Sequence, residues 1–209
     1  MKAMKGLVDF SEDLTAMGNS ADDAIRSLNG DLSLTGENMT LNNIDIDALI
    51  VKYEQSQNFS LVDVGAFLVV GPFGPLLTKG YDFSRLYQEP QGGKGGIGKL
   101  VSVWKVKNGV AEARDVALAS KNNRIAVKGK LDFINERFVD VTIAALDKRG
   151  CAVYSEKVHG PFGNPQIEKE SVFKSIAGSI LNPIKDAWKF IQDEKCAVFY
   201  SGSVAQPKG

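Results

Sequence analysis

Hydrophobic and polar residues alternate with a period of two through much of the region 100–158. In one stretch the apolar positions are Ile125, Val127, Leu131 and Phe133, and after a polar turn they are Val139, Val141, Ile143 and Ala145. This period is typical of strands in a sheet with one buried face. Turn-forming residues such as Asn108-Gly109 separate the runs. The pattern therefore predicts an antiparallel meander of about five strands.

The N-terminal part of the chain mixes strand and helix patterns. Val8 to Met17 is compatible with one extended strand, and Ser20 to Asp23 matches a capping box that begins a short helix. Apolar residues on either side of Gly36-Glu37-Asn38 predict a hairpin that turns at those three residues. Asp45 or Asp47 is expected to cap the helix that follows.

The C-terminal part is expected to return from helix to strand. Ser171 to Ile191 has helical spacing that Pro183 interrupts, and the segment beginning at Cys196 alternates like a strand. Glycines and Pro90 make residues 88–98 a flexible connection. The pattern thus predicts an α+β fold in which a mainly antiparallel sheet packs with a few helices, and 209 residues are enough for one large domain or two small ones.

The stretch from Leu61 to Leu77 is strongly apolar, with Asp63 as its only charged residue. It is too short, and too often interrupted by Gly-Pro pairs, for a transmembrane helix, which needs about 20 apolar residues. One interpretation is a helix buried against the sheet. The other is an apolar element that lines a groove or contacts lipid, and the candidate lipid-facing residues are then Phe67, Leu68, Val69 and Phe73.

Composition excludes some classes of function. The 209 residues include 44% hydrophobic residues, enough for a substantial core, and 25 basic residues balance 25 acidic ones. A nucleic-acid partner or an anionic membrane surface is therefore not favoured. His159 is the only histidine, which leaves little material for histidine-based catalysis or a multi-histidine metal site.

Several motifs suggest chemistry but lack the context that it requires. Residues 93–98 contain GxGxxG, yet a strand rather than a helix is expected to follow, so a phosphate-binding loop is not supported. His159 is expected to be a solvated loop residue. Asp22, Asp23, Asp45 and Asp47 occupy places where helix starts favour acids, so capping explains them without catalysis. No catalytic residue, cofactor or metal is predicted, and the enzymatic interpretation has little weight.

The chain's two cysteines begin nearly identical phrases, Cys151-Ala152-Val153-Tyr154 and Cys196-Ala197-Val198-Phe199. Two neighbouring strands joined by a disulfide would fit this repeat and an oxidising compartment. Two buried, reduced and unrelated thiols fit it equally well. Connectivity cannot be deduced from spacing alone, so both interpretations stand at this point.

Taken in order, several segments resemble the C-terminal region of the AsmA family. They include Leu28-Asn29-Gly30-Asp31-Leu32, Asn42-Asn43-Ile44-Asp45-Ile46-Asp47, Leu131-Asp132-Phe133, Val158-His159-Gly160-Pro161-Phe162-Gly163 and the segment from Cys196 to Gly202. The resemblance extends from about Val8 to Val204. Asn43 departs from it, because the family's glycine is expected at that position.

The resemblance implies that residues 1–209 form a single domain with a curved, groove-like antiparallel sheet. It also implies a non-enzymatic periplasmic domain of a protein anchored in the bacterial inner membrane. The implied role is outer-membrane homeostasis, through binding or transfer of phospholipid or another envelope lipid along an apolar β-groove, with envelope proteins as further partners. In the periplasm, Cys151 and Cys196 are expected to form a disulfide. The alternative function is a structural or protein-interaction module that caps a larger envelope assembly and binds no lipid.

Overall fold

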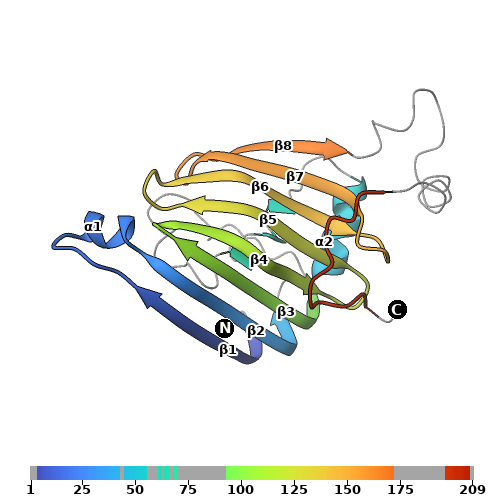
Figure 1. The fold of residues 1–209 in the computed structure, drawn as a ribbon. Coiled ribbons are helices and arrows are strands. Elements are labelled where there is room, and N and C mark those ends of the chain that lie inside the picture. The colour runs from blue at the N-terminus through green and yellow to red at the C-terminus, as the bar shows by residue number, and fades with distance from the viewer. Residues whose placement is uncertain are drawn as a thin grey trace.

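The computed structural model describes residues 4–42, 45–55, 61–62, 64–65, 68–69, 93–171 and 196–207. Eight antiparallel strands form one sheet in which each strand pairs with the next along the chain (Figure 1). The strands are β1 (Met4–Thr15), β2 (Asn29–Asn42), β3 (Lys94–Lys107), β4 (Val110–Ala119), β5 (Arg124–Asp132), β6 (Arg137–Leu146), β7 (Ala152–Pro161) and β8 (Gln166–Ser171). The meander expected between 100 and 158 is confirmed as β3–β7.

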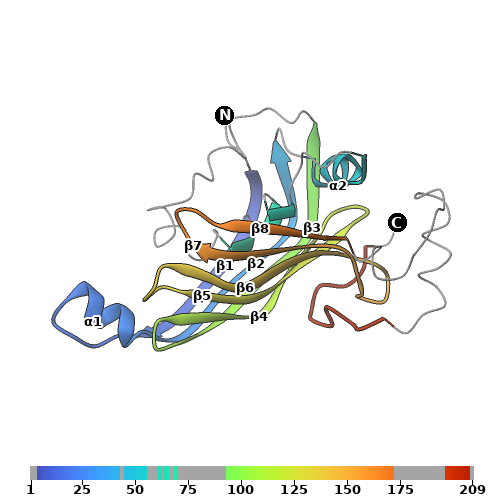
Figure 2. The same ribbon diagram turned by 90° about the horizontal axis from the view of Figure 1, so that it is seen from above.

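Both faces of the sheet pack against other parts of the chain. We call the face that bears Leu32, Trp104 and Leu131 the core face, because these residues belong to the main hydrophobic cluster. The opposite face, which bears Val101, Ala117 and Ala126, belongs to a second, smaller cluster and is called the outer face. Figures 1 and 2 show α2 and the C-terminal segment (196–207) on opposite sides of the sheet.

The helices α1 and α2 begin at the acids and hydroxyls that the sequence indicated. In α1 (Ala21–Arg26), the hydroxyl of Ser20 accepts a hydrogen bond from the Asp23 amide. In α2 (Ile46–Gln55), Asp45 Oδ1 accepts hydrogen bonds from the amides of Asp47 and Ala48, at 3.0 and 3.2 Å. Asp45 rather than Asp47 is therefore the capping residue, and the capping box at Ser20 is confirmed.

The hairpin expected at Gly36-Glu37-Asn38 is wrong, because β2 runs through these residues without turning. Asn38 has a φ of 51°, and buried positions change from the even-numbered Leu32 to the odd-numbered Met39 and Leu41 across it. One residue out of register moves every later side chain to the other face of a strand. The switch of the buried positions from even to odd numbers therefore marks an irregularity inside a long strand rather than a turn.

The expected flexible connection at 88–98 is wrong for its second half. Residues 94–98 are the start of β3 and pair with the end of β2, from Lys94 opposite Asn42 to Ile97 opposite Met39. Gly93 comes just before β3, and Gly95, Gly96 and Gly98 lie within it. Because a strand rather than a helix follows, these glycines do not form the phosphate-binding turn that GxGxxG can indicate. Residues 88–92 lie outside the described residues.

The end of the chain also differs from the prediction. Ser171 ends β8, a strand that the sequence analysis missed, and the expected helix beyond it lies outside the described residues. The segment from Cys196 is not a strand and makes only an isolated bridge, between Cys151 and Val198. His159 lies in β7 rather than in a loop. The strand pattern after Cys196 arises because this segment packs some of its side chains onto the outer face without pairing along it.

Candidate functional site

Part of the apolar stretch predicted at 61–77 covers the core face. Leu61, Val62, Val64, Gly65, Leu68 and Val69 are helical and buried, and we call them the covering segment. Gly65 lies so close to β6 that a methyl group added there would be 2.6 Å from Ile143 Cγ1. The buried-helix interpretation therefore describes these residues in the structure.

Two polar contacts attach the covering segment to the sheet. The Val62 amide donates a hydrogen bond to Glu156 Oε2 at 3.1 Å, and Glu156 on β7 is completely buried. At the other end, Ser102 Oγ donates to the Leu68 carbonyl at 2.8 Å and accepts from Trp104 Nε1 at 2.8 Å. These contacts fix the covering segment across the sheet, from β7 to β3.

The candidate lipid-facing residues divide between described and undescribed positions. Leu68 and Val69 are buried in the main hydrophobic cluster, whereas Phe67 and Phe73 lie outside the described residues. A lipid-contacting role for the four residues stays a prediction. In the structure, protein atoms cover the two that are described.

The core face is exposed to solvent at its β1 end. Phe10 lies opposite Leu34, and Val8 lies opposite Gly36, and direct cross-strand partners share a face of the sheet. Phe10 and Val8 are 50% and 43% exposed, although Leu34 packs against the main cluster. Met39, which is buried, lies over Gly36 beside Val8. An apolar surface therefore continues from the core to solvent, which the sequence analysis missed because it placed a hairpin at Gly36.

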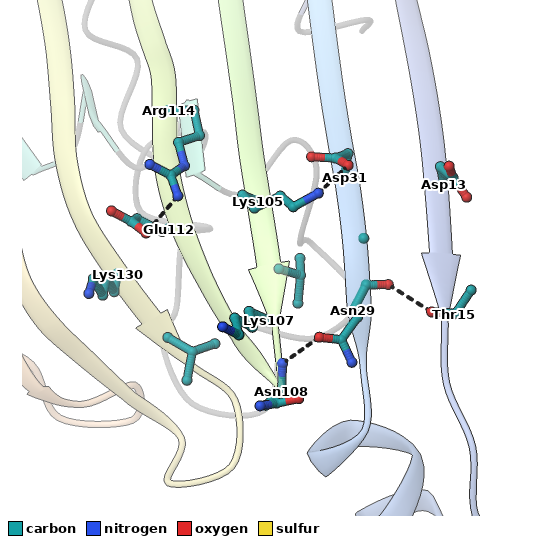
Figure 3. Close-up of a pocket in the computed structure, with 13 residues that line it drawn as sticks. Asp13, Thr15, Asn29, Asp31, Lys105, Lys107, Asn108, Glu112, Arg114 and Lys130 are labelled. Atoms are coloured by element: carbon teal, nitrogen blue, oxygen red, sulfur yellow. Dashed lines mark hydrogen bonds and ion pairs between the residues drawn. The ribbon is translucent and has the colours of Figure 1, made fainter.

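The outer face has a polar cavity of about 730 Å³ at the end of the sheet near α1 (Figure 3). Its floor is a row of charged residues that register brings side by side on five strands, in the order Asp13, Asp31, Lys105, Glu112 and Lys130. Lys105 Nζ lies 2.7 Å from Asp31 Oδ2, and Arg114 Nη2 lies 3.0 Å from Glu112 Oε2. The cavity holds charges of both signs, which favours no simple anion or cation.

The other end of the outer face is covered by the C-terminal segment. Cys151 and Cys196 form the expected disulfide, with Cα atoms 6.1 Å apart. Arg124 Nη1 donates to the Val204 carbonyl at 3.1 Å, and the Tyr200 hydroxyl donates to Asp115 Oδ1. Burial, followed by the hydrogen bond to Asp115, raises the pKa of Tyr200 to about 12. The disulfide is thus one of several attachments that hold this segment.

Two of the residues considered for catalysis, His159 and Asp47, have hydrogen-bond partners in the structure. His159 Nε2 lies 3.0 Å from Gln166 Oε1 and 3.8 Å from Glu168 Oε1, on the exposed side of β7 and β8. Within the described ranges, no group of three or more histidine, cysteine, aspartate or glutamate side chains is arranged to hold a metal ion. Asp47 accepts hydrogen bonds from Ser120 Oγ and Asn123 Nδ2, so it joins α2 to the β4–β5 turn.

Comparison with known proteins gives no relative. No family model, curated protein or solved structure matches this chain. In the part of the chain that the structure describes, no helix is long and apolar enough to span a membrane.

Proposed function

We propose that this chain is a non-enzymatic lipid-handling domain of the bacterial envelope, similar to the C-terminal region of AsmA proteins. The observation that carries the proposal is the exposed end of the core face, where Phe10 and Val8 continue a buried apolar surface into solvent. An acyl chain needs a continuous dry surface of this kind. The periplasm is the proposed compartment, because the Cys151–Cys196 disulfide requires an oxidising one.

The chemistry of the core face favours an acyl chain over a polar ligand. Its described side chains in the main cluster are aliphatic or aromatic, and Glu156 is already engaged with the covering segment. Glu12, opposite Leu32 on the edge strand, is a second acid on this face. A lipid would place its hydrocarbon against Phe10 and Val8 and leave its headgroup in solvent. The apolar β-groove that the AsmA resemblance implies would then be the open β1–β2 end of the core face.

The test is lipid extraction and native mass spectrometry of the chain purified from the periplasm of a Gram-negative host. We expect bound phospholipid, and we expect the double substitution Val8→Asp and Phe10→Asp to remove it while the fold stays intact. Ser11→Asp is the matched control, because Ser11 is exposed on the same strand but faces the outer side, opposite Ser33. Lipid-free wild-type protein, or equal loss in the control, would overturn the proposal.

A second candidate function is a structural or interaction module that binds no lipid. The observation in its favour is that α2 and the covering segment already pack on the core face. In that case Phe10 and Val8 contact a protein partner rather than a lipid. The extraction experiment separates the two functions, since only the lipid-handling domain carries phospholipid through purification.

A further inference from the structure

The two edges of the sheet are built differently. β1 and β8 end the strand order, so each has one side on which no described strand pairs. β1 is 12 residues long, whereas β8 has only 6. Short, charged edge strands discourage the addition of a further strand, and long edges with exposed apolar side chains invite it. β8, with Glu168 and Lys169, follows the first pattern.

β1 follows the second pattern on its core-face side. Phe10 and Val8 are half-exposed there, and the apolar surface that they belong to stops at the open edge. A strand added beside β1 would extend this surface if its side chains on that face were apolar. Cross-strand apolar pairs of this kind stabilise sheets.

On its outer-face side, β1 ends a row of alternating charge. From Lys130 the row passes through Glu112 and Lys105 to Asp31, so that each charge lies beside an opposite one. Asp13 comes next and breaks the alternation, because it lies beside Asp31, whose carboxylate already pairs with Lys105 (Figure 3). Among the described residues, none forms an ion pair with Asp13 or with Asp9, which lies on the same side of β1.

We propose that β1 is a strand-addition site for an extended segment of a partner protein in which apolar and basic side chains alternate. The apolar side chains lie beside Val8 and Phe10, and the basic ones lie beside Asp9 and Asp13, where they restore the alternation of charge. Backbone hydrogen bonds to the open edge supply affinity, and the alternating side chains supply specificity. The site shares Val8 and Phe10 with the lipid-handling function proposed above, but its acids Asp9 and Asp13 lie on the other side of β1, so substitutions of the acids test the strand-addition site alone.

A second copy of the chain fits this edge poorly. β1 carries three acids, Asp9, Glu12 and Asp13, and one base, Lys5. Pairing two such strands would bring two acidic segments together, and like charges across a strand pair are destabilising. The charge of β1 therefore points to a basic partner strand.

The experiment titrates the full chain with a short peptide of alternating valine and lysine, and with one of alternating valine and glutamate. We expect the lysine peptide to bind and to slow hydrogen exchange of the β1 amides. Reversing the acids with Asp9→Lys and Asp13→Lys should weaken its binding by about tenfold or more, by the usual size of cross-strand charge pairs. The same variant should gain binding of the glutamate peptide.

Glu168→Lys on β8 is the matched control, since it reverses a charge on the other edge strand and should leave binding unchanged. Circular dichroism checks that each variant folds. The proposal would be overturned if Glu168→Lys abolished binding, if the peptide slowed exchange in β8 rather than in β1, or if the two peptides bound with equal affinity. Self-association of the wild type that Asp9→Lys and Asp13→Lys remove would also overturn it, because the edge would then accept a second copy.

Discussion

Gly65 sets how closely the covering segment approaches the sheet. An added Cβ would lie 2.6 and 2.7 Å from Ile143 Cγ1 and Cδ1, so alanine overpacks the core although it favours a helix. We expect Gly65→Ala to lower the free energy of unfolding by about 1–3 kcal/mol. Urea denaturation measures this change.

Gly98→Ala is the control for that substitution, because the nearest atom to its added Cβ would be the Ala119 carbonyl oxygen at 3.6 Å. Ile143→Ala provides a second check, since it removes the side chain that the new methyl group would meet. If Gly65→Ala lowers the free energy of unfolding as much in the Ile143→Ala variant as in the wild type, the close contact with Ile143 is not the cause.

Tyr200 gives the attachment of the C-terminal segment a dependence on pH. The pKa of Tyr200 is raised from 10.0 to about 12, by burial and then by the hydrogen bond to Asp115. The folded state therefore holds this proton more tightly than the unfolded state does. The stabilisation is fully present below about pH 10 and is lost as the pH rises from about 10 to 12.

We expect Tyr200→Phe to reduce stability at neutral pH by about 2 kcal/mol, because the hydroxyl donates to Asp115 Oδ1 and accepts from the Val204 amide, and each hydrogen bond contributes about 1. The difference between wild type and variant should shrink above pH 10, as measured by denaturation over a pH series. Comparing the two proteins cancels the titration of lysines, which both share. A difference that stays constant up to pH 12 would show that the hydroxyl proton is not involved.

At the scale of elements, Ser102 joins β3 to the covering segment. Its hydroxyl takes part in two buried hydrogen bonds, one to the Leu68 carbonyl and one from Trp104 Nε1. We expect Ser102→Ala to cost about 2 kcal/mol, because each hydrogen bond contributes about 1. Unfolding in urea with tryptophan fluorescence measures the loss. Ser11→Ala on the exposed side of β1 should change stability by less than about 0.5 kcal/mol, and an equal effect of both substitutions would contradict the assigned role.

The disulfide joins the start of β7 to the C-terminal segment across 45 residues of chain. In the chain-entropy model a loop of this size contributes about 3–4 kcal/mol. The double substitution Cys151→Ser and Cys196→Ser should therefore lower the melting temperature, and reductant should lower that of the wild type but not that of the variant. The sheet should keep its circular dichroism spectrum at room temperature, because neither Cys151 nor Cys196 belongs to one of the strands β1–β8. An unchanged melting temperature would contradict this expectation.

The elements that the sequence predicted well are those in which one local pattern dominates. Alternation and the Asn108-Gly109 turn located β3–β7, where Asn108 and Gly109 both have positive φ, and Ser20 and Asp45 located two helix starts. The predicted hairpin at Gly36 was wrong because an irregularity inside a strand switches the buried positions from even to odd numbers, as a turn can also do. β8 was not predicted because an edge strand with mostly exposed residues has no regular alternation of buried and exposed positions.

The candidate site was harder to predict, because it depends on contacts between distant parts of the chain. The sequence indicated that 61–77 is apolar, but the attachment of Val62 to Glu156 joins residues far apart in sequence. Likewise, the charges of Asp13, Lys105 and Lys130 become one row only through strand register. The sequence shows which residues are apolar or charged, whereas the pairing of the strands decides which of them lie side by side.

Across the whole molecule, stability should fall from the centre of the sheet toward β1. The central strands β4–β6 are bordered on both sides and bury residues on both faces. In β1, from Lys5 onward, only Leu14 is even partly buried, so opening this strand exposes little apolar surface. Regions with few buried contacts open at low free energy. We expect amides of the edge strands β1 and β8 to exchange with deuterium before those of the other strands, and those of β5 last.

Native-state hydrogen exchange at increasing low concentrations of denaturant measures this order. If β1 opens separately, its exchange should respond weakly to denaturant, because the response scales with the surface exposed. Exchange of β5 should follow global unfolding. Exchange of β1 at the same free energy as β5 would show that the sheet opens only as a whole.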